Sequence, residues 1–189
     1  METILVLVAV FAAYSIFLYN RLVALRQTRK NAFSDIDVQL KQRYNLVPQL
    51  VDTVKGYAKH EKETFENVTA ARAGIDKTSQ GSGPDAGRIK AENALGAAMM
   101  NLFAVAENYP DLKADQNFQR LMSELSDIEN KLAAARRFFN SATNEFNTAV
   151  QQFPANIFAG MFGFSEEPFF EIEENIKDAV NKAPDVKFD

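Results

Sequence analysis

The residues with the greatest potential for chemistry are His60, Glu61 and Glu63, which lie together in one charged stretch. An imidazole and two carboxylates are ligand types that a metal ion accepts. Positions i, i+1 and i+3 of a helix do not converge on one face, and the chain has 1 His and no Cys with which to complete a ligand shell. We therefore predict that His60 is a surface residue and that the protein uses no metal and no other cofactor.

Two other patterns that could support catalysis are incomplete. Asp35 and Asp37 are two positions apart, so on a helix they point to different sides and form a poor general acid and base pair. Residues 81–84, Gly-Ser-Gly-Pro, lack the lysine and the following helix start that a phosphate-binding loop needs. Since no nucleophile stands beside a base, we predict that the protein is not an enzyme.

Composition limits the partners. The 189 residues fit one modest domain, and 21 Lys and Arg against 25 Asp and Glu give a net charge of -4. With a sequence pI near 5.2, the chain is a poor candidate for binding nucleic acid. Without cysteine, the redox compartment cannot be inferred.

The N-terminal segment has the composition of a membrane span. Residues 4–19 carry no charge, and as a helix they would cover about 24 Å, whereas a hydrocarbon core is roughly 30 Å thick. Spanning therefore also needs residues 22–25 and an Arg21 whose side chain reaches back to the interface. A cleaved signal peptide would begin with basic residues, but Glu2 precedes the apolar run; a buried core helix is the other alternative. We predict a transmembrane anchor at residues 1–25.

The charges beside this anchor predict its orientation. Arg21, Arg26, Arg29 and Lys30 follow the apolar run, and no Lys or Arg precedes it. By the positive-inside rule, the N-terminus faces outward and the rest of the chain lies in the cytoplasm.

The body of the chain, residues 26–154, has the periodicity of a helical bundle. Apolar residues recur every three or four positions along three segments, which is the spacing of a helix with one buried stripe. We predict helices at about residues 33–75, 85–109 and 115–153, with a loop near 76–86. Pro48 removes a backbone donor inside the first helix, so a kink or break is expected at residues 44–47. Asp115 is expected to cap the third helix and Pro154 to stop it.

The predicted fold is therefore all-α. A transmembrane helix leads into an elongated antiparallel three-helix bundle, with two long helices and one shorter helix, and the chain ends in a short helical tail. This tail, residues 155–189, begins rich in Phe and becomes acidic, with a possible last helix at 172–180. Its bulky residues either pack on the bundle or are offered to another protomer or to a membrane. The candidates for apolar docking are Phe158, Met161, Phe162 and Phe164.

Several polar residues lie on or beside the predicted helix seams. They are Asp35, Asp37, Arg43, Glu61, Arg72, Glu107, Glu129, Arg136, Asn140 and Asn147. Charges along a seam can pair within the bundle, meet another subunit or bind a ligand or ion. Pairing inside the bundle gains little stability but fixes the register of the helices, and we take it as the main expectation.

Three blocks of the sequence resemble the LemA family of bacterial membrane-anchored proteins. They are NAFSDIDVQLKQRYNLVPQLVDTVKGYAKHEKETFENVTAAR at 31–72, AENYPDLKADQNFQRLMSELSDIENKLAAARRFFNSATNEFN at 106–147, and FPANIFAGMFGF at 153–164. The resemblance implies an all-helical bundle behind one N-terminal span and no known enzymatic activity. Some relatives are implicated in forming or shaping internal membranes, including those of magnetosomes, and others sit beside envelope proteases and stress systems.

These features predict a non-enzymatic, membrane-anchored scaffold in the inner (plasma) membrane of a bacterial cell. A rod on a short anchor, with seam charges and an aromatic end, suits repeated lateral contact, so we expect the lipid bilayer and further copies of the chain as partners. The alternative is an adaptor that docks its Phe-rich end and acidic tail on a membrane protease or other envelope protein.

Overall fold

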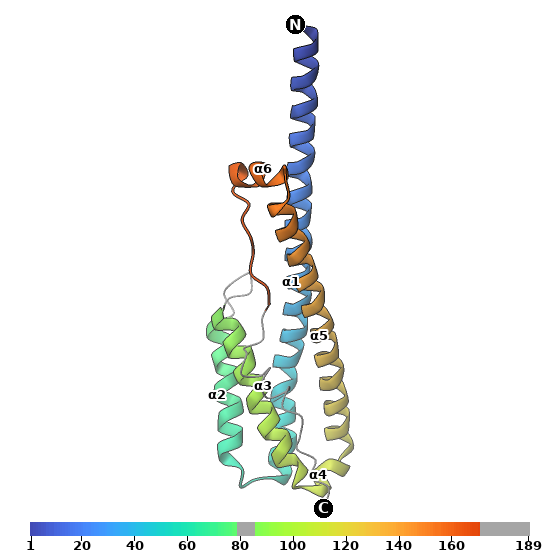
Figure 1. The fold of residues 1–189 in the computed structure, drawn as a ribbon. Coiled ribbons are helices and arrows are strands. Elements are labelled where there is room, and N and C mark those ends of the chain that lie inside the picture. Colours follow the sequence, from blue (N-terminus) through green and yellow to red (C-terminus); the bar gives the residue numbers. More distant parts are fainter. Residues whose placement is uncertain (79–85, 171–189) are drawn as a thin grey trace, which may run out of the picture.

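The chain is an elongated all-α molecule in a computed structural model, which describes residues 1–78 and 86–170 (Figure 1). The helices are α1 (Glu2–Tyr57), α2 (Lys62–Thr78), α3 (Ala86–Glu107), α4 (Pro110–Ala114), α5 (Gln116–Gln151) and α6 (Ala155–Phe162). No strand occurs in these described residues. The predicted all-α class, with a long apolar helix at the N-terminus, is confirmed.

Helix α1 is one continuous element of 56 residues, so it extends for about 84 Å. Its N-terminal part stands clear of the other helices, and its C-terminal part forms the spine of the bundle (Figure 1). Of the kink or break predicted at residues 44–47, the break is wrong, because the helix runs through Pro48, and the kink stays a prediction. Val47 and Leu50, on either side of the proline, are buried in the same core, and this packing outweighs the missing hydrogen bond.

The predicted helix at residues 33–75 is in fact two helices. Helix α1 ends at Tyr57, the chain turns at Ala58, and α2 runs back beside the same core. The Ala58 amide closes the end of α1 by donating to the Val54 carbonyl oxygen at 2.9 Å. The apolar spacing continues across the turn because both helices bury their stripes in one core, so periodicity alone did not reveal it.

The distal half of the rod, at the end farthest from the N-terminus, packs α1, α2, α3 and α5 around the largest core (Figure 1). Helix α5 begins as predicted, with the Asp115 carboxylate accepting a hydrogen bond from the Phe118 amide at 2.8 Å. Toward the N-terminus only α1 and α5 remain side by side, and the buried clusters become smaller. The bundle is therefore four helices thick at its distal end and two helices thick where α1 leaves it.

Beyond α5 the chain turns, and α6 lies beside α1 and transverse to it instead of running along it (Figure 1). Gly163 ends α6 with φ of 72°, a left-handed conformation that favours glycine, and the Phe164 amide donates to the Ala159 carbonyl oxygen. Residues 164–170 then return along the bundle without helical structure; we call them the return segment. The predicted last helix at 172–180 and most of the loop near 76–86 lie outside the described residues.

Candidate functional site

The N-terminal part of α1 is an apolar surface without a protein partner over most of its length. Its most apolar window has a mean hydropathy of 2.0 and is only 6% buried. A core helix would be covered, so the alternative of a buried core helix does not fit. The arrangement is suited to contact with the acyl chains of a membrane.

Helix α6 packs against the C-terminal part of this apolar segment, between Phe11 and Tyr19. The Phe158 ring centroid lies 5.9 Å from that of Phe11, and the Phe162 centroid lies 5.0 Å from that of Tyr19. Of the four docking candidates, Phe158 and Phe164 are buried against their own chain, whereas Met161 and Phe162 are exposed. The structure thus divides the Phe-rich segment into a packed side and a bare side.

The strongest polar feature is a buried charge cluster that joins α1, α3 and α5. Arg43 of α1 pairs with Glu92 of α3 and, at 3.0 Å, with Glu129 of α5. Arg43 and Glu92 are only 4% and 3% exposed. Burial lowers the pKa of nearby Arg136, as does the charge of Arg43, while Glu129 and Glu92 oppose this effect. Two positive and two negative groups balance, so this arrangement is suited to holding three helices in register.

A second ion pair lies beside this cluster. Arg88 of α3 donates to Asp37 of α1 at 2.6 Å, and its guanidinium lies 5.6 Å from the Phe33 ring centroid. Burial raises the pKa of Asp37, and the neighbouring Arg88 opposes that rise. Within residues 1–78 and 86–170, no group of His and acidic side chains gathers that could hold a metal ion.

Asn140 and Asn147 of α5 hold the return segment against the bundle. Asn140 accepts from the Phe170 amide at 2.8 Å and donates to its carbonyl oxygen at 3.1 Å. Asn147 makes the same two bonds with the backbone of Glu167, at 2.8 and 2.9 Å. Seven helical residues advance about 10.5 Å and three extended residues about 10 Å, so the spacings match. We call this arrangement the asparagine clamp.

Arg29 of α1 reinforces the clamp. It donates to the Thr143 hydroxyl at 3.0 Å and to the Pro168 carbonyl oxygen at 2.9 Å, and it pairs with Glu167 at 3.2 Å. Burial lowers the pKa of Arg29, and Glu167 opposes this effect. The sequence analysis used Arg29 only for orientation, because its partners lie more than a hundred residues away in the chain.

The other predicted seam residues have more local surroundings. Arg72 lies with its guanidinium 3.9 Å from the Tyr44 ring centroid, and Glu61 accepts a long hydrogen bond of 3.5 Å from the Tyr109 hydroxyl. Asp35 and Glu107 are exposed on the surface. These two remain candidates for contact with another subunit.

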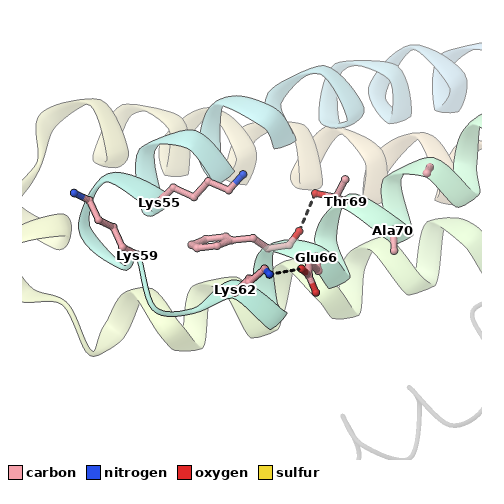
Figure 2. A pocket seen from close by; sticks show the side chains of 8 residues that line it. Lys55, Lys59, Lys62, Glu66, Thr69 and Ala70 are labelled. Carbon is pink, nitrogen blue, oxygen red and sulfur yellow. Dashed lines mark hydrogen bonds and ion pairs between the residues drawn. The ribbon is translucent and has the colours of Figure 1, made fainter.

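The distal tip carries a basic groove of about 710 Å³ that the sequence analysis missed. Lys55, Lys59 and Lys62 surround it, Phe65 contributes an aromatic surface, and Glu66 is the one acidic residue in its lining (Figure 2). The Lys55 ammonium lies 5.5 Å from the Phe65 ring centroid. Such a groove is suited to an anionic group with an apolar neighbour.

Glu92 and the lysines of the basic groove, which the sequence analysis did not single out, left a signal in the sequence. Glu92 stands three residues after Ile89 and three before Leu95, so an acidic residue occupies a position with the seam spacing. The groove lysines recur at steps of four and three, and because the chain reverses there, they lie at the end of α1, in the connection and at the start of α2. That reversal was the part that periodicity did not reveal.

Comparison with known proteins identifies similar chains. The LemA family model matches residues 32–188. Magnetosome protein MamQ 2 of Paramagnetospirillum magneticum is 24% identical, over 87% of this chain and 68% of its own. Magnetosome protein MamQ of Magnetospirillum gryphiswaldense is 25% identical, over 80% of this chain and 64% of its own. Protein LemA of Metamycoplasma hominis is 27% identical, over 82% and 69%.

Proposed function

Because the chain belongs to the LemA family, we propose that it is a non-enzymatic, membrane-anchored helical scaffold. In this proposal it self-associates at the cytoplasmic membrane and organises or shapes that membrane. The observation that carries the proposal is the bare apolar part of α1, continuous with a rod whose other end is a closed four-helix core. An uncovered apolar helix of this kind needs a bilayer, and a rigid rod transmits its position to neighbouring copies.

The charges near the base of the exposed segment support an orientation with the bundle in the cytoplasm. Arg21, Arg26 and Lys30 are exposed just beyond the apolar residues, where anionic lipid headgroups would meet them. Helix α5, with 36 residues, then carries the bundle about 54 Å away from the membrane.

The membrane-proximal half of the rod also offers surfaces for self-association. Val38 of α1 and Phe138 of α5 are large apolar residues that remain exposed on this thinner part of the bundle. Anchoring in one membrane raises the effective concentration of neighbouring copies, so weak lateral contacts suffice for assembly. Exposed Asp35 adds a charged group on the same part of α1.

Mass photometry and crosslinking of the full-length protein, in mild detergent and in native membranes, test self-association. We expect multimers, and we expect the double variant Val38→Ser with Phe138→Ser to shift them toward monomers. Met100→Ser is the control, because Met100 is an even more exposed apolar residue, on α3 in the distal half. Monomers alone in both environments would contradict the scaffold.

The adaptor for a membrane protease or other envelope protein is the second candidate. The basic groove favours it, because the groove lies at the end of the rod farthest from the anchor and is not needed by the scaffold. Capture of one stoichiometric partner by the wild type, lost in Lys55→Glu with Lys62→Glu while multimers persist, would support the adaptor. No loss in that variant would remove the groove from the argument.

A further inference from the structure

We propose that α6 lies in the plane of the membrane, at the boundary between headgroups and acyl chains, in the same bilayer that α1 spans. It would thus be a second, non-spanning membrane contact, whose partner is lipid. This inference rests on the proposed anchor, and its test reports on the anchor and on α6 separately.

The first observation is the chemistry of the surface that α6 leaves uncovered. Residues 150–165 contain no charged side chain. Ala155, Phe158 and Ala159 are buried against the bundle, so the opposite side of α6 faces outward. The exposed large apolar side chains in and beside α6 are Phe153, Ile157, Met161 and Phe162, with 81%, 56%, 74% and 49% exposed. A patch of this kind on one short helix marks an interaction surface.

The second observation is the height of α6 on α1. Phe158 contacts Phe11 and clusters with Leu18, and Ala159 lies in one buried cluster with Leu22. A hydrocarbon core of roughly 30 Å takes about 20 helical residues, so a span that begins near Thr3 reaches the level of Leu22. Any bilayer that covers the bare part of α1 therefore reaches α6.

If α6 lay in water, too little of α1 would remain inside the bilayer to span it. A bilayer that ended above Phe11, leaving α6 in water, would cover only about 12 Å of α1. That is less than half of the thickness that a span requires. The uncharged run at residues 4–19 covers only about 24 Å, so a full span also takes in Leu22, which shares a buried cluster with Ala159 of α6.

The direction and borders of α6 also fit a membrane interface. Because α6 lies transverse to α1, it runs along the membrane plane when α1 spans (Figure 1). Tyr19, an aromatic residue of the kind that collects at interfaces, has its ring beside those of Phe162 and Phe164. Charges begin just beyond, with the Arg26 guanidinium 5.8 Å from the Phe164 ring centroid. Apolar side chains on the bilayer side and basic residues on the water side are the arrangement found in interfacial helices.

Continuity argues for lipid over a second copy of the chain. Phe162, an exposed residue of α6, has its ring beside that of exposed Tyr19 of α1, and neither residues 4–19 nor residues 150–165 carry a charge. The acyl chains that cover α1 can therefore also cover the bare side of α6. Phe153 and Met161 are the two most exposed residues of the group. Phe153 lies just before α6 and Met161 has a flexible side chain, so both can insert among acyl chains without a shaped partner.

Depth measurement by fluorescence quenching tests the inference in the full-length protein. The chain has no native cysteine, so one substitution gives one attachment site for an environment-sensitive fluorophore. Ile157→Cys and Met161→Cys report on α6, and Leu7→Cys reports on the anchor. Ser126→Cys, on the exposed surface of α5 in the distal half, is the aqueous control. The labelled proteins are reconstituted in vesicles of phosphatidylcholine with a minority of phosphatidylglycerol.

Quenching by lipids that carry a nitroxide near the top of the acyl chain is compared with quenching by aqueous iodide. For the labels at 157 and 161 we expect lipid quenching severalfold stronger than at 126, together with protection from iodide. Iodide quenching at 157 and 161 as strong as at 126, with lipid quenching retained at 7, would overturn the inference and leave the anchor intact. Loss of lipid quenching at 7 would instead overturn the anchor and the inference together.

Protection from both quenchers at 157 and 161 would point to a second copy as the occupant and would also overturn the inference. Both label sites are exposed, so their substitution leaves the core intact. A label at Phe153→Cys repeats the measurement beside α6, and the helical circular dichroism of each variant reports on folding.

Discussion

The distal and membrane-proximal halves of the rod solve the same packing problem in different ways. In the distal half, α1, α2, α3 and α5 close around one apolar core and a buried charge cluster on Arg43. In the proximal half, small clusters and the ring contact between Phe33 and Phe139 join α1 to α5, and the asparagine clamp holds the return segment on α5. The distal half buries its apolar core without a further partner, whereas the proximal half leaves apolar surface uncovered.

This difference separates stability from function. Burial in the distal half stabilises the chain and fixes the register of its helices, so substitutions of its buried residues should lower the free energy of unfolding of the whole molecule. The uncovered apolar residues of the proximal half add little to the stability of one chain in water. In the proposed scaffold, these residues would be buried by the bilayer or by another copy of the chain.

The largest effect is expected in the distal half on removal of the buried cation. Arg43→Met leaves Glu92 buried without its partner, because the Glu92 side chain is only 3% exposed. Breaking a buried pair in this way costs about 3–5 kcal/mol of the free energy of unfolding. Denaturant titration followed by circular dichroism, in detergent, measures this loss.

Glu129→Gln is the control for that variant. The Glu129 side chain remains 46% exposed, so water solvates the group, and we expect a loss of less than about 1 kcal/mol. Equal losses of unfolding free energy in Arg43→Met and Glu129→Gln would show that the buried Glu92 does not make the loss of Arg43 more costly.

In the proximal half, loss of one clamp residue should act locally. Asn147→Ala removes both hydrogen bonds to the Glu167 backbone, which lowers the free energy of local opening by about 1–3 kcal/mol. Hydrogen exchange at the Glu167 amide should accelerate while the distal core keeps its protection. Asn144→Ala, which changes an exposed residue on the same helix, is the control and should leave that rate unchanged. Acceleration throughout the chain would contradict the independence of the two halves.

Acid should weaken the contact between α1 and the start of α5 at the distal tip. The Phe118 amide, the Tyr57 hydroxyl and the Asn117 amide all donate to Asp115 and hold the pKa of its carboxyl below the ordinary value of 3.8. A lowered pKa in the folded state means stability that is present above pH 3.8 and is lost as the pH falls through the folded-state pKa. The melting temperature of the wild type should therefore fall at acidic pH.

Asp115→Asn keeps an N-cap acceptor but does not titrate. We expect this variant to show a smaller fall in melting temperature between neutral pH and about pH 3, measured by circular dichroism. An identical pH profile in the two proteins would mean that the Asp115 carboxylate does not stabilise the tip.

The smallest effect is expected at the surface of the basic groove. Lys62 and Glu66 are 3.7 Å apart, and both side chains are largely exposed. Glu66→Gln should change the free energy of unfolding by less than about 0.5 kcal/mol, since exposed pairs contribute little. A larger loss in denaturant titration would assign the groove charges to stability rather than to binding.

The sequence predicted α5 well because its signals agree. Its apolar spacing is uninterrupted, Asp115 caps it, and the helix ends just before Pro154. The turn at Ala58 escaped prediction because both flanking helices contribute to the same core, so the stripe continues through the reversal. Pro48 was overestimated for a related reason, since tertiary packing around it compensates for one absent hydrogen bond.

The candidate site was only partly predictable. Asn140 and Asn147 stood out as polar residues near a seam, but their partners are backbone groups of a non-helical segment, and sequence spacing carries no signal for such a contact. The Phe-rich composition predicted an apolar patch. Which rings are buried depends on the crossing of α6 and on the turn at Gly163, neither of which composition determines.

Cryo-electron microscopy of the full-length protein in lipid nanodiscs tests the central claim most directly. We expect a multimer in which α1 crosses the lipid density, α6 lies at its edge, and the distal four-helix ends project away. A uniform monomer with α6 clear of the lipid would contradict both the scaffold and the division of the rod into a closed half and a membrane-completed half.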